Sequence, residues 1–155
     1  MIGRPIGSIV IALLLTMAAA SESRAACTIS TTGVAFGTYN VFNAGVVSST
    51  GSVSYTCGLL EALFGNITIA LSTGQSGTYA SRQMRKGTEP LLYNLYLNAA
   101  ATSIWGNGTG GTQTYARTRP PFNTAVVVTV YGRLPAGQDV SAGTYTDTIS
   151  ATINF

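Results

Sequence analysis

Residues 145–155 alternate between two kinds of side chain, and this pattern constrains the fold more than any other feature. One face carries Thr, Ser and Asn, and the other is apolar apart from a single aspartate, Asp147. A period of two with many β-branched residues is typical of a half-buried β-strand. Chain termini are usually disordered unless a sheet holds them, so we expect this strand to be part of the core. Its neighbour is either a strand of this chain or one supplied by another chain, and that choice decides the function.

The start of the chain has the layout of a secretory signal peptide. Arg4 supplies a positive charge, residues 6–20 are almost all apolar, and small residues stand at Ala25 and two positions before it. This layout predicts export and cleavage after Ala25. A membrane anchor is not expected, because a spanning helix needs about 20 apolar residues. We therefore assign residues 1–25 to the signal peptide and residues 26–155 to one domain.

The composition of the mature chain favours an all-β protein. Gly, Ser, Thr, Tyr, Val and Ile dominate, and no apolar stretch with a helical period follows the signal peptide. About seven short strands are expected, around residues 27–30, 53–57, 66–71, Tyr79, 91–97, 126–131 and 145–155. The 91–97 segment has large side chains on both faces, so we expect it to be covered on both sides. Strands at this spacing predict an antiparallel β-sandwich of immunoglobulin-like type, with a closed barrel as the alternative.

The side chains needed for most catalysis are missing. The chain has no histidine, which is the commonest general base and metal ligand. Glu61 and Glu89 are formally able to form the carboxylate pair of a glycosidase, but nothing distinguishes them from solvated loop charges. We therefore predict no catalytic residue, no metal site and no cofactor. The net charge of +3 is too small and too scattered to favour nucleic-acid binding.

Trp105 is the residue most suited to contact a ligand or a partner. It begins a segment, residues 105–111, that is mostly glycine. Such a segment predicts a flexible turn or hairpin tip, so we expect Trp105 to be exposed. There it would stack on a sugar ring, enter a partner's pocket, or simply lie at a turn that faces solvent.

The two cysteines, Cys27 and Cys57, are expected to form a disulfide. An even pair in an exported chain is typical of a structural bridge, and two free thiols do not fit an oxidising compartment. Cys27 shares a strand face with Ile29, and Cys57 shares one with Tyr55, so both sulfur atoms are expected on the apolar side. Closing a loop of about 31 residues stabilises a fold by roughly 3–4 kcal/mol in the chain-entropy model.

Separated blocks of the sequence resemble one protein family. The first reads Cys-Thr-Ile-Ser, and the last reads Gly-Thr-Tyr-Thr-Asp-Thr-Ile. The blocks cover residues 27–30, 34–39, 51–57, 92–96, 104–108, 131–138 and 143–149. Together they resemble the spore coat protein U domain family over essentially the whole mature chain. That family is shared with subunits of archaic, Csu-type chaperone–usher pili, which are fibres for surface attachment and biofilm formation.

The resemblance implies an immunoglobulin-like sandwich that lacks its last strand. In such subunits a periplasmic chaperone fills the gap first, and another pilus subunit fills it after delivery to the outer-membrane usher. The residues expected in this chaperone and donor-strand groove are Ile29, Ile149, Ala151, Ile153 and Phe155. Burying about four such side chains is worth roughly 6–12 kcal/mol, and an added strand also satisfies the exposed edge.

The predicted start of the mature chain departs from the pattern of a subunit that donates a strand. Cleavage after Ala25 leaves only Ala26 before Cys27, so this chain is expected to accept a strand but not to give one. We therefore predict a non-enzymatic structural or adhesive pilus subunit, exported through the periplasm to the cell surface. In a fibre such a subunit belongs at the distal tip, and a single-domain tip, an initiator subunit and a family member outside pili all stay open. The alternative is a self-complete secreted coat or binding module, in which residues 33–39 or the Trp105 hairpin cover the open edge.

Overall fold

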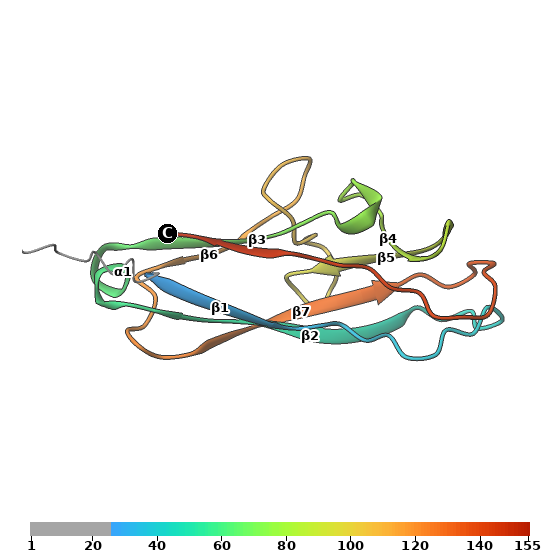
Figure 1. Ribbon diagram of the computed structural model, residues 1–155, viewed down its shortest axis with the longest axis horizontal. Helices are drawn as coiled ribbons and strands as arrows, with labels where there is room; N and C mark the ends of the chain where they lie inside the picture. Colours follow the sequence, from blue (N-terminus) through green and yellow to red (C-terminus); the bar gives the residue numbers. More distant parts are fainter. Residues whose placement is uncertain (1–25) are drawn as a thin grey trace, which may run out of the picture.

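The computed structural model describes residues 26–155, so the predicted signal peptide lies outside the described residues. This part of the chain forms two antiparallel β-sheets (Figure 1). The strands are β1 (Cys27–Thr32), β2 (Val47–Cys57), β3 (Asn66–Leu71), β4 (Arg82–Lys86), β5 (Glu89–Tyr96), β6 (Tyr115–Thr118), β7 (Val126–Leu134) and β8 (Ala151–Asn154). The helical segments are α1 (Leu59–Phe64) and the 3-10 turn η1 (Gly74–Ser76). The predicted all-β architecture is confirmed.

The two sheets form the layers of a sandwich. The larger sheet has the strand order β1-β2-β7-β5-β4, and the smaller has the order β6-β3-β8. Each ladder between these strands is antiparallel. Figure 1 shows β1, β2 and β7 in one layer and β3, β6 and β8 in the other. β1 and β8 are edge strands of different sheets that lie near each other, so the sandwich has two free edges on the same side.

Side-chain alternation explains how the core forms. In β3 every second residue is buried, namely Ile67, Ile69 and Leu71. β2 repeats the pattern through Val53 and Tyr55, which are also buried. Because successive side chains of a strand point to opposite faces, the Ser and Thr residues between them face outward. The strand faces predicted from these two segments are confirmed.

The chain that precedes β8 crosses from one sheet to the other. The amide of Arg85 donates to the carbonyl of Thr146 at 2.8 Å, and the amide of Thr146 donates to the carbonyl of Arg85 at 3.1 Å. Further along the chain, β8 pairs with β3. One backbone edge of residues 140–154 therefore forms hydrogen bonds first with β4 and then with β3. The other backbone edge faces the side of the sandwich where β1 lies.

The segment that follows β1, residues 33–41, belongs to no regular strand and is positioned by glycines of the larger sheet. A Cβ at Gly132 of β7 would lie 2.6 Å from Val34 and 2.8 Å from Phe36. A Cβ at Gly51 of β2 would lie 2.9 Å from Val34 and even closer to the backbone of β1. Because only glycine leaves this space, the two sheet positions determine where the segment lies.

Three local features differ from expectation. The edge strand expected around Tyr79 is β4, because Arg82 turns its side chain into the core and begins the pairing with β5. The outer face of the 91–97 strand is covered only in part, since Asn94 is buried there but Leu92 is 37% exposed. The six-residue helix α1 was not expected, because so short a segment does not show a helical period.

Candidate functional site

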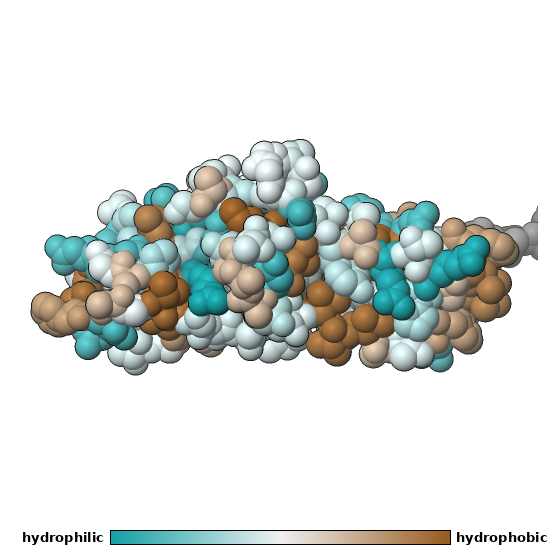
Figure 2. All heavy atoms as spheres, turned by 180° about the vertical axis from the view of Figure 1, so that it is seen from behind, coloured by the Kyte–Doolittle hydropathy of each residue, from teal (hydrophilic) through white to brown (hydrophobic). Residues whose placement is uncertain are grey.

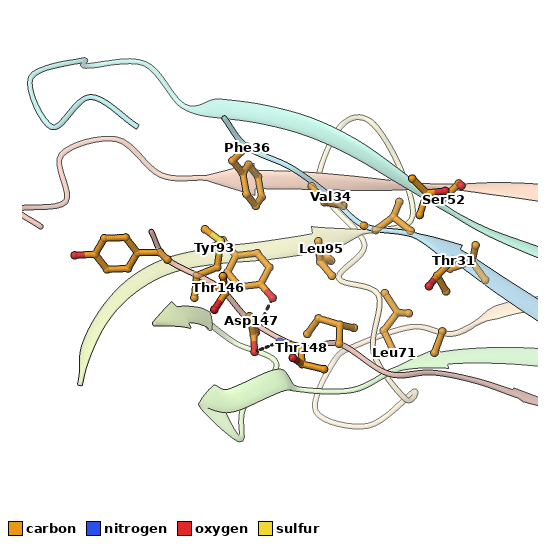
Figure 3. Close-up of a pocket in the computed structure, with 18 residues that line it drawn as sticks. Thr31, Val34, Phe36, Ser52, Leu71, Tyr93, Leu95, Thr146, Asp147 and Thr148 are labelled. Atoms are coloured by element: carbon orange, nitrogen blue, oxygen red, sulfur yellow. Dashed lines mark hydrogen bonds between the residues drawn. The ribbon is translucent and has the colours of Figure 1, made fainter. Parts of the chain in front are cut away.

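A groove runs along the open side of the sandwich (Figure 3). One wall comes from residues 31–41, and the other comes from residues 140–151. The groove consists of two adjoining hollows of about 430 Å³ and 760 Å³. The hollows have four lining residues in common: Val34, Phe36, Met84 and Tyr145. They therefore form one elongated site rather than two separate ones.

The floor of the groove is the apolar core itself. Leu71 of β3, Tyr93 and Leu95 of β5, and Val130 of β7 line it, and each of them is at most 5% exposed. The Phe36 ring lies edge-on to the Tyr93 ring, with 5.7 Å between the ring centroids. An apolar strand laid in the groove would thus bury its side chains against a core that is already assembled.

The wall that precedes β8 presents an unsatisfied backbone edge. The backbone groups of Thr146 and Ser150 hydrogen-bond back into the sandwich, to β4 and to the residue that follows β3. Successive residues of an extended chain direct these groups to opposite sides. Accordingly, within residues 26–155 the amides of Tyr145, Asp147 and Ile149 have no hydrogen-bond acceptor. This row of donors is the feature that a further strand would satisfy.

The Asp147 carboxylate is held rigidly in this wall. Its Oδ2 accepts a hydrogen bond from the Tyr93 hydroxyl at 2.7 Å, while its Oδ1 accepts from the amides of Gln75 at 2.9 Å and Thr148 at 2.8 Å. A Cβ at Gly74 would collide with the carboxylate. Burial and the hydrogen bond to Asp147 raise the pKa of Tyr93, so its hydroxyl remains a donor. Figure 3 shows this carboxylate between Tyr93 and Thr148.

A buried cation lies behind the groove. Arg82 is 0% exposed, and its guanidinium donates to Asn94 Oδ1 at 2.8 Å, to the Ser72 carbonyl at 2.9 and 3.0 Å, and to the Trp105 carbonyl at 2.6 Å. These partners are all neutral. Burial lowers the pKa of Arg82, and the nearby Asp147 carboxylate opposes that shift.

The prediction that Trp105 is exposed is wrong. Its side chain is 0% exposed, and its Nε1 donates to the Ile69 carbonyl at 2.9 Å. Its ring lies 6.4 Å from that of Tyr115, centroid to centroid. The glycines that follow form the turn, and the tryptophan at its base packs between the sheets. Trp105 thus does not line the groove.

The five residues predicted to line the groove occupy different places. Ile149 and Ala151 line it. Ile29 and Ile153 are partly buried against the core, closer to α1 and outside this lining. Phe155 follows β8 and is 58% exposed. Their role in binding a strand stays a prediction.

Sequence reasoning missed part of the groove. Val34 and Phe36 form its second wall, and Tyr93 forms part of its floor. The alternation of Val34 with Phe36 after the first strand was an available signal. Asp147 was noticed as an interruption of the last strand, but its hydrogen bonds to other elements were not predictable from that pattern.

Hydrogen bonds fix the groove wall at the end away from α1. Glu89 accepts from the Ser141 amide at 2.7 Å and from the Ser141 hydroxyl. Lys86 donates to the carbonyl of Ala142 at 2.6 Å and to the Ser141 hydroxyl at 2.7 Å. The hydrogen bonds from Ser141 lower the pKa of Glu89 to about 2. This cluster holds residues 140–145 against the larger sheet.

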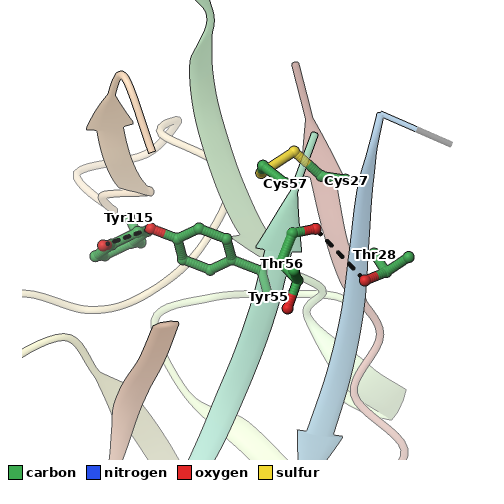
Figure 4. Close-up of a disulfide and its surroundings, with 6 residues drawn as sticks. All are labelled: Cys27, Thr28, Tyr55, Thr56, Cys57 and Tyr115. Carbon is green, nitrogen blue, oxygen red and sulfur yellow. Dashed lines mark hydrogen bonds between the residues drawn. A yellow bond between two sulfur atoms is a disulfide. The ribbon is translucent and has the colours of Figure 1, made fainter. Parts of the chain in front are cut away.

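The predicted disulfide between Cys27 and Cys57 is present and joins β1 to β2 (Figure 4). The two residues are ladder partners and both are buried. The hydroxyls of Tyr55 and Tyr115 lie 3.2 Å apart and connect β2 to β6 of the other layer. Burial and this hydrogen bond raise the pKa of Tyr55. β1 is an edge strand with a neighbour on only one side. The disulfide therefore helps to hold β1 and the groove wall of residues 31–41 that continues from β1.

The rest of the surface formed by the described residues offers no comparable site. Apolar side chains gather at the α1 end, the right end in Figure 2, where four residues of α1 are exposed: Leu59, Leu60, Leu63 and Phe64. Within residues 26–155, no three His, Cys, Asp or Glu side chains lie close enough together to hold a metal ion. The same range contains no helix with the length and apolarity needed to cross a membrane.

Comparison with solved structures identifies the class of fold. The chain is similar to the structure titled a CsuC–CsuE chaperone–tip adhesion subunit pre-assembly complex, from archaic chaperone–usher Csu pili of Acinetobacter baumannii. The TM-score is 0.55 and the sequence identity is 21%. The match covers 83% of this chain but only 39% of that chain. This likeness defines an immunoglobulin-like β-sandwich, as the sequence predicted.

Comparison of sequences identifies the family. The family model of the Spore Coat Protein U domain matches residues 13–152. Protein U of Myxococcus xanthus is 36% identical over 132 residues, which are 77% of this chain and 70% of that protein. The chain therefore belongs to the Spore Coat Protein U domain family, and the resemblance drawn from its sequence blocks is confirmed.

Proposed function

We propose that the protein is a non-enzymatic, secreted subunit of a chaperone–usher surface pilus, and that its groove accepts a β-strand from another protein. The observation that carries this proposal is the combination of an apolar floor with the unsatisfied amides of Tyr145, Asp147 and Ile149. Added strands use both features, because backbone hydrogen bonds give affinity and alternate side chains fill pockets. No other site among residues 26–155 combines them.

The geometry favours a strand that runs antiparallel to residues 140–154, as do the other ladders of the fold. In such a pair, residues directly opposite each other point to the same face. The residues opposite Tyr145, Ile149, Ala151 and Ile153 would then point into the sandwich. Burying four apolar side chains there is worth roughly 6–12 kcal/mol, which is as much as the whole stability of many domains.

The partners follow from this mode of binding. A periplasmic chaperone would fill the groove first, and another pilus subunit would replace it at an outer-membrane usher. The similar Acinetobacter baumannii structure holds a chaperone with a tip adhesion subunit. With the predicted cleavage after Ala25, little chain remains before Cys27 to act as a donor, which supports a position at the distal tip. Attachment and biofilm formation would be the outcome at the cell surface.

A self-complete secreted coat or binding module is the second candidate. Residues 33–39 favour it, because Val34 and Phe36 already cover part of the inner face of the larger sheet. These residues form a wall of the groove, however, and do not pair with the opposite wall. The buried Trp105 contributes no cover either. The pilus subunit is therefore the preferred proposal.

A fused donor strand tests the choice. Figure 1 shows that the C-terminus lies at the α1 end, where a strand antiparallel to residues 140–154 has to begin. A turn of about four residues and an alternating strand of about 12 residues are therefore added after Phe155, and the full chain is exported with and without this addition. Both proteins are then unfolded in urea. We expect the fusion protein to unfold cooperatively and to be more stable by several kcal/mol.

The matched control carries Asp in place of the apolar residues of the donor strand. It should resemble the chain without the addition, since it offers backbone groups but no apolar side chains. The pilus proposal fails if the chain alone is a soluble monomer that unfolds cooperatively and if the apolar donor strand adds no stability. The self-complete module is then the better proposal.

A further inference from the structure

Asp147 is the feature of the groove that the proposed function leaves unexplained. Among the described residues that line the groove, it is the only charged one. It interrupts an inward face otherwise built from Tyr145, Ile149, Ala151 and Ile153. A charged group in an apolar binding surface is costly unless its hydrogen-bonding capacity is met, so its presence restricts what is able to bind.

The free acceptor capacity of Asp147 can be counted. An ionised carboxylate has about four lone-pair sites. Two on Oδ1 are used by the amides of Gln75 and Thr148, and one on Oδ2 is used by the Tyr93 hydroxyl. One site on Oδ2 therefore remains, on a side chain that lines the groove.

The unmet need of Asp147 is a hydrogen bond at the remaining acceptor site on Oδ2, and a neutral donor meets it without burying a second charge. Arg82 lies behind the groove with only neutral hydrogen-bond partners, and the Asp147 carboxylate acts on it electrostatically. An apolar strand residue over Asp147 would remove water from the remaining acceptor site without replacing the hydrogen bond. A neutral donor side chain would satisfy that site.

We propose, on the basis of the proposed function, that Asp147 sets the register of the incoming strand. The strand carries Ser, Thr or Asn directly opposite Asp147 and apolar residues at the other inward positions. A slip of two residues in either direction would place an apolar side chain over the carboxylate. A single polar residue in an apolar interface specifies register in the same way in coiled coils.

The test uses the fusion protein with the full chain and varies one donor position at a time. In one version Thr stands opposite Asp147 and Leu stands opposite Ile149, and in the other the two residues are exchanged. The two versions have the same composition, so general hydrophobicity and strand propensity are matched. We expect the unfolding equilibrium constant in urea to be at least about tenfold lower when Thr faces Asp147.

A second variant separates hydrogen bonding from a merely structural role. Tyr93→Phe removes the hydroxyl that donates to Oδ2 and so leaves a second acceptor site unmet. The preference for Thr over Leu opposite Asp147 should then grow, whereas a structural defect would weaken both versions equally. Equal stability of the two exchanged versions, or a preference for Leu, overturns the role of Asp147 while leaving the groove proposal intact. If no donor strand stabilises the chain, both proposals are overturned.

Discussion

A methyl group added at Gly132 tests how residues 33–39 are seated on the larger sheet. The substitution Gly132→Ala would by itself stabilise the chain by about 0.4–1 kcal/mol, because it restricts the unfolded state. In the structure, however, the new Cβ would lie 2.6 Å from Val34 and 2.8 Å from Phe36. Overpacking of this kind typically costs about 1–3 kcal/mol. The cost exceeds the gain, and we expect a net loss of roughly 1–2 kcal/mol.

The neighbouring glycine should be less tolerant. A Cβ at Gly51 would lie 2.5 Å from the carbonyl oxygen of Thr32, and backbone relaxes less readily than a side chain. Gly33 is the matched control, since a Cβ there meets nothing within 4 Å. Urea unfolding of the fusion protein should therefore place the three alanine variants in the order Gly33, Gly132, Gly51 from most to least stable.

A double-mutant cycle identifies the cause. Val34→Ala removes the methyl groups that meet the new Cβ at Gly132, so the two substitutions should couple favourably by about 0.5–3 kcal/mol. If Gly132→Ala stabilises the protein as Gly33→Ala does, residues 33–39 do not lie on the sheet in solution, and the groove wall described here is incorrect.

Three further predictions concern the core, the disulfide and pH. Replacing Cys27 and Cys57 together by Ala should lower the free energy of unfolding by roughly 3–4 kcal/mol, and equal stability under reducing and oxidising conditions would contradict this. Trp105→Phe should cost about 1–3 kcal/mol, because it leaves the Ile69 carbonyl without its donor; a fluorescence maximum of the wild-type protein typical of exposed tryptophan would refute the burial. The pKa of Glu89 is lowered to about 2 from its usual 4.5, so its contribution to stability is present above about pH 4.5 and is lost as the pH falls toward 2. The stability difference from Glu89→Gln should shrink over that range, and a pH-independent difference would exclude this role.

The strands were predictable wherever side chains alternate over several residues. The faces of β2 and β3 and the inward face of residues 145–153 follow from the period-two pattern. The burial of Arg82 was not predictable, because arginine is rarely fully buried and its acceptors come from segments far apart in sequence. Trp105 was misjudged for a related reason, since the glycines beside it indicate local flexibility but say nothing of the tertiary contacts that bury the ring.

Half of the groove was predictable and half was not. The wall that leads into β8 follows from the C-terminal alternation. The opposite wall depends on Val34 and Phe36, whose position is set by glycines in β2 and β7. The alternation of Val34 with Phe36 predicts an extended segment, but the sequence does not show which glycines of other strands make room for these side chains.

Amide hydrogen exchange along residues 145–150 tests the central claim most directly. In the chain without a donor strand, the amides of Tyr145, Asp147 and Ile149 should exchange rapidly, whereas that of Thr146, which donates to Arg85, should be protected. In the fusion protein all four amides should be protected, because the added strand supplies the missing acceptors. Protection of all four amides in the chain alone would mean that its edge is already satisfied, and would contradict the account of an open groove completed by another protein.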